Sequence, residues 1–218
     1  MLQILRRHRP DFRPGRMVSY SDSNYVLLGM IIEKITGAPV KRTIDRLARG
    51  AGLRRTTFPT VARLRSPFAH GYYAGDEGDQ PLADYTLVNP DVPWTAGNMT
   101  TTVGDLQRWA VALGTGRLIS KRLFRAQRRF RPIANPGGPK VGYGLGLFHI
   151  GDWIGHNGAI YGFSTTLMQP SSFFLNMSYA CGACSSGTRC VTRSSTPSGS
   201  SSPVSSGMIS STHCFTCA

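Results

Sequence analysis

Apolar residues recur every three or four positions early in the chain, and this period predicts two successive helices. The first runs from about Asn24 to Thr36, and it is apolar almost all round, so we expect it to be well buried. Gly37 ends this helix, and Pro39 opens a second one that closes at Gly50 and Gly52. The residues available to cap the first helix are Ser21, Asp22 and Ser23.

Two further helices are predicted in the middle of the chain. The segment from Val103 to about Leu113 has one apolar face, and Thr102 with Asp105 resembles a capping box at its start. Ser120 is placed to cap a fourth helix. Residues 53–95 lack a sustained period, which predicts irregular structure with short strands around residues 69–73.

The period changes to alternation after the helices. Val141 to Ile150 alternates with glycines between its apolar residues, which predicts a strand, and Tyr161 to Met168 predicts another. We expect antiparallel strands in this region, joined through Gly151 and Asp152. Helices followed by antiparallel strands indicate an α+β fold.

The periodic patterns stop near residue 170, so we predict a folded domain over residues 1–170 and a tail over residues 171–218. Residues 181–218 hold 17 Ser and Thr and no Asp, Glu or Lys. Such a segment buries too little apolar surface to offset its ordering entropy, so we expect the tail to be disordered.

Charge and cysteine content change this picture little. The net charge is +14, but the basic residues are dispersed and no reader motif accompanies them, so we expect no nucleic-acid partner. All five cysteines lie in the tail, where the spacer between two Cys-x-x-Cys pairs lacks the apolar residues of a structural zinc site. We expect neither a metal nor another cofactor. The sequence has no apolar run of 18 residues, so we expect no transmembrane helix.

Two polar segments carry the candidate chemistry. Tyr20-Ser21-Asp22-Ser23-Asn24-Tyr25 precedes the first helix, and Gly155-His156-Asn157-Gly158 lies between glycines late in the chain. Together they are consistent with two of the three parts of a serine acyl-transfer site. Each also has a structural interpretation: Tyr20 and Asp22 as a helix cap with a packed aromatic ring, and His156 as an ordinary strand-turn histidine.

These segments, in this order, resemble the serine beta-lactamase and D-alanyl-D-alanine carboxypeptidase family, in its class C-like branch. The further stretches that carry the resemblance are residues 12–15, 26–29, 32–37, 96–99, 101–106, 143–146 and 162–164. The resemblance covers about residues 10–168. It implies a beta-lactamase/transpeptidase-like fold that is incomplete here, with the helical region and part of the antiparallel sheet.

The resemblance also implies roles for six residues. Tyr20 would be the phenol that moves a proton between nucleophile and leaving group, with His156 as a nearby cation that favours phenolate. Asp22 stands where the family often has Asn, and it would hold the substrate amide. The edge formed by Asn157 and Gly158 would pair with the substrate backbone, and the Ala159 N–H would supply half of an oxyanion hole.

The family's nucleophile motif, Ser-x-x-Lys, does not occur in this sequence. The residues three positions before the four lysines are Ile31, Ala38, Leu118 and Gly137. We therefore expect a serine hydrolase fragment, truncated at both ends and inactive alone, from a family that acts on beta-lactams, D-Ala-D-Ala peptides or esters. The alternatives are a non-catalytic module that binds a small molecule or a peptidoglycan peptide, and a zinc or nucleic-acid binder that uses the tail. The family is usually extracytoplasmic, but Met1 to Arg7 is no signal peptide, so the sequence leaves the compartment open.

Overall fold

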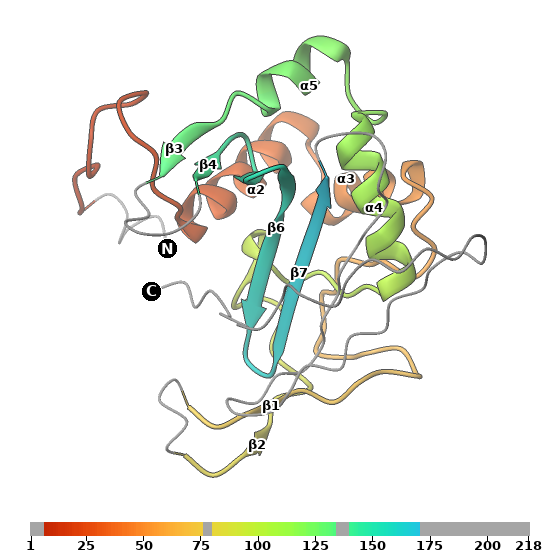
Figure 1. Cartoon of the computed structure of the whole chain (residues 1–218). Coiled ribbons are helices and arrows are strands. Elements are labelled where there is room, and N and C mark those ends of the chain that lie inside the picture. The colour runs from red at the N-terminus through yellow and green to blue at the C-terminus, as the bar shows by residue number, and fades with distance from the viewer. Residues whose placement is uncertain (1–6, 76–79, 134–139, 171–218) are drawn as a thin grey trace, which may run out of the picture.

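The structure, a computed structural model, describes residues 7–75, 80–133 and 140–170. Helices lie around one end and one side of an antiparallel sheet, and a two-stranded ribbon lies beyond the far tip of its longest hairpin (Figure 1). The helices are α2 (Asp22–Thr36), α3 (Val40–Gly50), the 3-10 turn η1 (Trp94–Ala96), α4 (Val103–Thr115) and α5 (Lys121–Gln127). This arrangement confirms the α+β expectation.

The sheet contains five antiparallel strands in sequence order, from β3 to β7. Its strands are β3 (Arg131–Ile133), β4 (Val141–Tyr143), β5 (Phe148–Ile150), β6 (Trp153–Ile160) and β7 (Phe163–Pro170). The separate ribbon pairs β1 (Tyr72–Tyr73) with β2 (Ala83–Asp84). The short strand expected around residues 69–73 is therefore present.

The expectation of one strand over Val141–Ile150 is wrong. The chain turns back at Gly144–Leu147, so that Tyr143 pairs with Phe148 across two separate strands. Gly146 has a φ of +72°, which glycine adopts without the steric penalty of a side chain, and this allows the reversal. Gly151 and Asp152 do join antiparallel strands, as expected, but those strands are β5 and β6.

The β6–β7 hairpin is the longest pairing of the sheet. Its register runs from Trp153 opposite Pro170 to Ile160 opposite Phe163. Tyr161 and Gly162 form the two-residue turn, and Gly162 takes a φ of +77°. A positive φ at the second turn residue is typical of a type II turn. The second predicted strand therefore begins two residues later than expected, because Tyr161 belongs to the turn.

Helix α2 is less buried than its sequence predicts. Of its 15 residues only Val26 and Gly29 are buried, and Ile35 is 79% exposed. Among the described residues, η1 and α3 contact this helix, and they cover only part of its apolar circumference. The helix does end at Gly37, whose φ of +62° is left-handed. Ser21 precedes its first turn without making a side-chain cap.

Helix α4 follows its sequence closely. The Thr102 side chain accepts a hydrogen bond from the Asp105 N–H, which confirms the expected start. The Asp105 side chain is 1% exposed and accepts from the Arg55 N–H at 2.7 Å and the Thr56 hydroxyl at 2.9 Å. Its other carboxylate oxygen accepts from Arg108 at 2.8 Å. Asp105 is therefore a structural anchor between α4 and the segment after α3.

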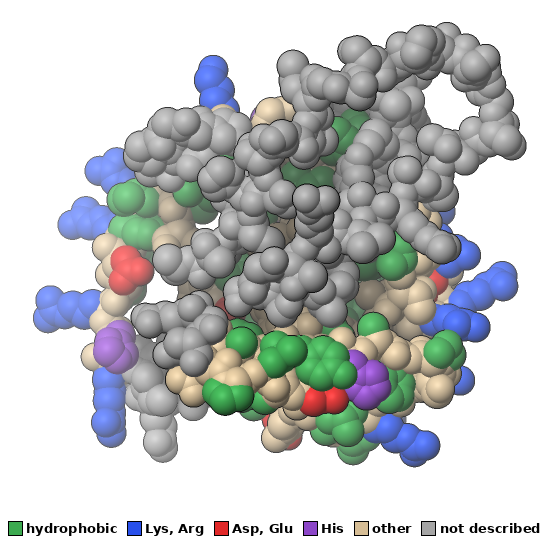
Figure 2. All heavy atoms as spheres, turned by 60° about the horizontal axis from the view of Figure 1, so that its bottom comes forward, with side chains coloured by type: hydrophobic (Ala, Val, Ile, Leu, Met, Phe, Trp, Pro, Cys, Tyr) green, Lys and Arg blue, Asp and Glu red, His purple; other side chains and the backbone are tan. Residues whose placement is uncertain are grey.

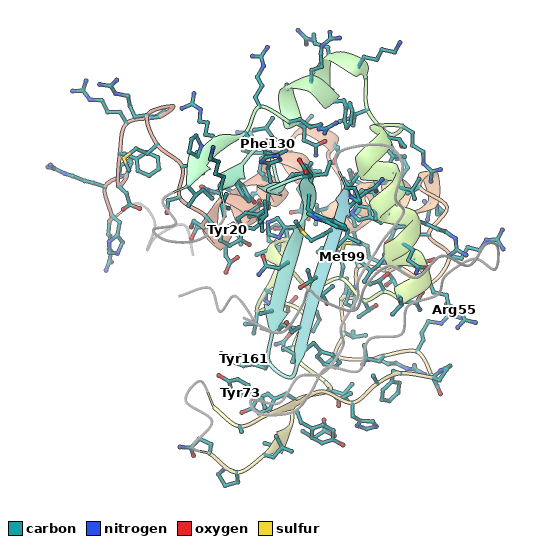
Figure 3. All side chains as sticks on the ribbon, in the orientation of Figure 1. Tyr20, Arg55, Tyr73, Met99, Phe130 and Tyr161 are labelled. Carbon is teal, nitrogen blue, oxygen red and sulfur yellow. The ribbon has the colours of Figure 1, made fainter. Side chains whose placement is uncertain are left out.

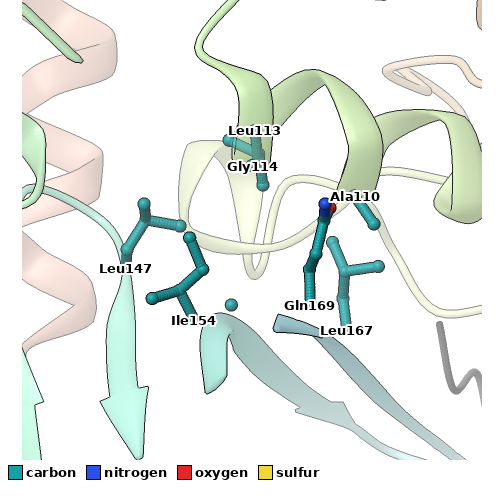
Figure 4. A pocket seen from close by; sticks show the side chains of 8 residues that line it. Ala110, Leu113, Gly114, Leu147, Ile154, Leu167 and Gln169 are labelled. Carbon is teal, nitrogen blue, oxygen red and sulfur yellow. The ribbon is translucent and has the colours of Figure 1, made fainter. Parts of the chain in front are cut away.

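Helix α4 packs against the β6–β7 hairpin. A cavity of about 10 Å³ remains there, lined by side chains of both layers (Figure 4). The Gln169 side chain reaches into it toward Gly114, and its Oε1 has no partner among the described residues. A space of this size admits about one water and no larger ligand, so it is no substrate site.

The predicted tail, with all five cysteines, lies outside the described residues, and the domain boundary near residue 170 stays a prediction. None of the helices in residues 7–75, 80–133 and 140–170 has the length and hydrophobicity of a membrane span.

Candidate active site

Tyr20 and His156 are separated by 135 intervening positions, and the fold brings their rings together. Tyr20 lies just before α2 and His156 lies within β6, with ring centroids 5.7 Å apart. The Tyr20 hydroxyl donates to Asp22 Oδ1 at 2.9 Å. Figure 3 shows Tyr20 beside the end of the sheet where β6 begins. The two segments singled out in the sequence therefore face one another.

A series of hydrogen-bonded side chains runs from α2 through β4 to the His156 ring. The Tyr143 hydroxyl lies 3.0 Å from His156 Nε2, and it also bonds to the hydroxyl of Tyr25 on α2. On the other side of the ring, His156 Nδ1 bonds to the main-chain oxygen of Asn157. Because a carbonyl only accepts, Nδ1 carries the proton and Nε2 accepts from Tyr143. Tyr25 then donates to Tyr143, so each bond in the chain has one donor and one acceptor.

Burial makes His156 a neutral ring. It lowers the pKa of the imidazole, and the bond to the Asn157 carbonyl opposes this shift only in part. Aromatic neighbours provide the apolar surroundings, with the Phe148 ring 4.8 Å from His156. The resemblance implied a cation at this position, whereas the structure favours an uncharged imidazole at neutral pH.

Burial also raises the pKa of Tyr25 and, more strongly, that of Tyr143. For Tyr143 the adjacent Tyr25 phenol acts in the same direction. Both phenols therefore keep their protons at neutral pH and act as fixed hydrogen-bond groups.

Next to the His156 ring, strand β6 has a neighbouring strand on one side only among the described residues. Strand β7 pairs with all eight residues of β6, but β5 pairs only with residues 153–155. No strand in residues 7–75, 80–133 and 140–170 pairs with residues 156–160 on the β5 side. Gly158 and Ala159 are exposed there and Asn157 is half-buried. The structure thus places these three predicted substrate-binding residues along one open strand edge.

Sequence reasoning named six residues, and the fold brings three of them together, namely Tyr20, Asp22 and His156. The other three, Asn157, Gly158 and Ala159, follow His156 along β6. Sequence reasoning missed Tyr25, Tyr143 and Phe148, which surround the imidazole. The available signal was that two of them belong to stretches of the family resemblance. Among the described residues, no group of three or more His, Cys, Asp or Glu side chains is placed to hold a metal ion.

A family model described as Beta-lactamase matches residues 1–171. The match covers well over half of the chain, so the protein belongs to the Beta-lactamase family. A curated protein of Escherichia coli (strain K12), named "Putative D-alanyl-D-alanine carboxypeptidase", is 38% identical over 67 residues. Those residues are 30% of this chain and 15% of that relative.

Solved structures support the same fold. A D-stereospecific amidohydrolase from Streptomyces sp. is 35% identical with a TM-score of 0.69, over 75% of this chain and 50% of that one. D-amino acid amidase from Ochrobactrum anthropi SV3, complexed with D-phenylalanine, is 27% identical with a TM-score of 0.64, over 78% and 52%. A penicillin-binding protein from Bacillus halodurans has a TM-score of 0.56 at 16% identity, over 78% and 50%, and shows the fold alone. The chain spans about half the length of these structures.

Proposed function

We propose that this chain carries the substrate-binding side of a serine hydrolase cleft for D-amino-acid amides or D-Ala-D-Ala peptides, and that it binds such ligands without turning them over. The observation that carries the proposal is the 5.7 Å approach of Tyr20 and His156 next to the open edge of β6. The substrate class rests on the similarity to a D-stereospecific amidohydrolase and a D-amino acid amidase.

The open edge suits an extended ligand. In an antiparallel ladder, opposite residues alternate between exchanging two main-chain hydrogen bonds and exchanging none. The two-residue turn makes Ile160–Phe163 a bonded pair, so Gly158 and His156 also bond toward β7. The N–H and C=O groups of Asn157 and Ala159 then face the open side. This alternation supports the Ala159 N–H as a donor to a carbonyl oxygen, as an oxyanion hole requires.

Tyr20 stands where the resemblance implies the proton-transfer phenol of the family's cleft. Its phenol is partly exposed, whereas the phenols of Tyr25 and Tyr143 are engaged in the buried chain behind His156. Both ring nitrogens of His156 already have partners. We therefore assign His156 to positioning: it holds the Asn157 carbonyl and the Tyr143 hydroxyl in place, and it presents no cation to Tyr20. Asp22 orients the Tyr20 hydroxyl.

The step that this chain is proposed not to perform is the covalent acylation of a serine. Acylation requires a nucleophile, and the 218-residue sequence contains no Ser-x-x-Lys. The proposal is therefore the non-catalytic ligand-binding module, with the open edge of β6 as its binding surface.

The test uses the full 218-residue chain. Incubation with a fluorescent penicillin followed by denaturing electrophoresis should give no covalent band, and calorimetry with a D-amino-acid amide should give saturable binding. Tyr20→Phe should leave binding nearly intact, whereas Ala159→Pro, which removes the proposed edge N–H, should abolish it. Stoichiometric covalent labelling would overturn the non-catalytic part. No binding by a chain shown to be folded by circular dichroism would overturn the proposal as a whole.

A further inference from the structure

Three tyrosines form a cluster beyond the tip of the β6–β7 hairpin. The ring centroids of Tyr73 and Tyr161 lie 5.2 Å apart, those of Tyr85 and Tyr161 5.5 Å, and those of Tyr73 and Tyr85 5.6 Å. Tyr73 comes from β1, Tyr85 follows β2, and Tyr161 is the first turn residue of the hairpin. Segments nearly 90 positions apart thus contribute to one aromatic surface, which we call the tyrosine cluster.

Close backbone contact fixes the tyrosine cluster to the hairpin. A Cβ on Gly162 would lie 2.6 Å from the main-chain carbon of Gly71, and a Cβ on Gly71 would lie 2.4 Å from the Phe163 ring. Only hydrogen atoms fit at these two positions, so the ribbon packs directly against the hairpin turn. The cluster is therefore held in place relative to β6.

The rings remain accessible although they touch one another. Tyr161 is 49% exposed, and Tyr85 is exposed as well. Hydrophobic side chains gather on the face of the molecule that carries the ribbon (Figure 2). Aromatic rings that stay exposed side by side offer π faces and edges to a further ring.

The tyrosine cluster lies at the far end of the open edge of β6. Tyr161 follows Ala159 by two residues, which is about 7 Å along a strand, and it follows His156 by five, about 17 Å. Figure 3 shows Tyr73 and Tyr161 together at the hairpin tip, with Tyr20 near the other end of the strand. An extended ligand on this edge would run from the Tyr20–His156 end to the tyrosine cluster.

We propose that Tyr73, Tyr85 and Tyr161 form a subsite for an aromatic group on the acyl side of the ligand. This inference rests on the proposed function, because it takes the carbonyl of the ligand to lie at Ala159. A ligand that pairs antiparallel with β6, as every neighbour in this sheet does, directs its amino-terminal side toward Tyr161. A ring one residue before the acyl carbonyl then reaches the tyrosine cluster, where it stacks against rings already ordered by one another.

The opposite face of the ribbon supplies a matched control. Neighbouring residues of a strand point to opposite faces, and Tyr72 stacks on His70 instead of joining the tyrosine cluster. Tyr72 is 41% exposed, close to the exposure of Tyr161. Removing its ring tests for general effects of losing an exposed tyrosine from the same ribbon.

The experiment compares two probes by calorimetry on the full chain: phenylacetyl-D-Ala-D-Ala and acetyl-D-Ala-D-Ala. We expect the phenylacetyl probe to bind about three- to tenfold more tightly, the range of one favourable ring–ring contact. Tyr161→Ser and Tyr85→Ser should each reduce this preference toward one, and Tyr72→Ser should leave it unchanged. Circular dichroism should show all three variants folded; if Tyr161→Ser is not, Tyr161→Leu, which keeps an apolar side chain, takes its place.

The outcomes separate the two proposals. Equal binding of both probes, or a preference that survives the Tyr161 and Tyr85 substitutions, would eliminate the tyrosine subsite while leaving the cleft in place. Loss of the preference in Tyr72→Ser would likewise count against it. If neither probe binds the folded chain, the proposed function fails and the subsite fails with it.

Discussion

The Tyr143 hydroxyl lies 3.0 Å from Nε2 of His156 and also bonds to the Tyr25 hydroxyl. One oxygen thereby joins β4, β6 and α2, and the bond from Tyr143 to Tyr25 on α2 spans 118 positions of the sequence. The imidazole orientation, and with it the Asn157 carbonyl, depends on this junction. Tyr143 is therefore the residue through which the helical part of the fold sets the geometry of the open strand edge.

Tyr143→Phe should destabilise the protein by about 1–3 kcal/mol, because it leaves the Tyr25 hydroxyl and His156 Nε2 without their shared partner. Urea denaturation followed by circular dichroism measures this change in the free energy of unfolding. Tyr20→Phe removes a partly exposed hydroxyl and should cost less. An equal loss in the two variants would argue against a special role for Tyr143.

The stability of the protein should depend on pH through His156. Burial holds its pKa below the ordinary value of 6.5, so the unfolded chain binds a proton more tightly than the folded one. The free energy of unfolding should then stay level above about pH 6.5 and fall as the pH drops from there toward the folded-state pKa.

Two measurements check this dependence. Titration of the His156 ring protons by NMR should give a pKa below 6.5. Denaturation midpoints from about pH 8 to about pH 5 should fall less in His156→Gln than in the unaltered chain. A His156 pKa above the ordinary value would refute the neutral-ring assignment.

Asp105→Asn should destabilise the fold by about 2–4 kcal/mol. Burial acts against the charged carboxylate, but hydrogen bonds from the Arg55 N–H, the Thr56 hydroxyl, the Arg54 N–H and Arg108 outweigh it and hold the pKa below its ordinary value. The stability that Asp105 contributes is present above about pH 3.9 and is lost as the pH falls through the lowered value. Thermal denaturation measures the effect, and the exposed Asp91→Asn serves as a control that should change little.

Gly29→Ala should destabilise the protein although alanine is the better helix former. A Cβ at this position would lie 2.5 Å from the Thr95 side chain, where η1 packs on α2. Overpacking of this kind costs about 1–3 kcal/mol, more than the gain in helix propensity of about 1 kcal/mol. The same change at Gly50 in α3 meets no atom within 4 Å and should be neutral or stabilising. The denaturant midpoint should therefore fall in Gly29→Ala and stay level or rise in Gly50→Ala.

Local signals in the sequence were sufficient for the helices. The Thr102 cap and the periodic apolar residues after it predicted α4, because a helix depends on neighbours within one or two turns. The strands were harder. The turn between β4 and β5 depends on a positive φ at Gly146. An alternating pattern with glycines is compatible with one continuous strand and with two strands joined by a turn, so the pattern alone did not predict this turn.

The candidate site divides in the same way. Tyr20 and His156 stood out because they lie in compact polar motifs, and in the fold their ring centroids lie 5.7 Å apart. Tyr25 and Tyr143 did not, because their significance comes from a contact across 118 positions that no local pattern encodes. The overestimated burial of α2 has the same origin. The apolar residues of a helix show how much surface it could bury, but the elements that pack against it determine how much is buried.

The open side of β6 has a consequence for handling the protein. Unpaired main-chain groups on a strand are a template for any other extended chain, including a second copy of this one. An empty cleft should therefore favour edge-to-edge self-association at high concentration, and an occupying peptide should compete with it. Solubility measured with and without a tight ligand would then report on how well that ligand fills the edge.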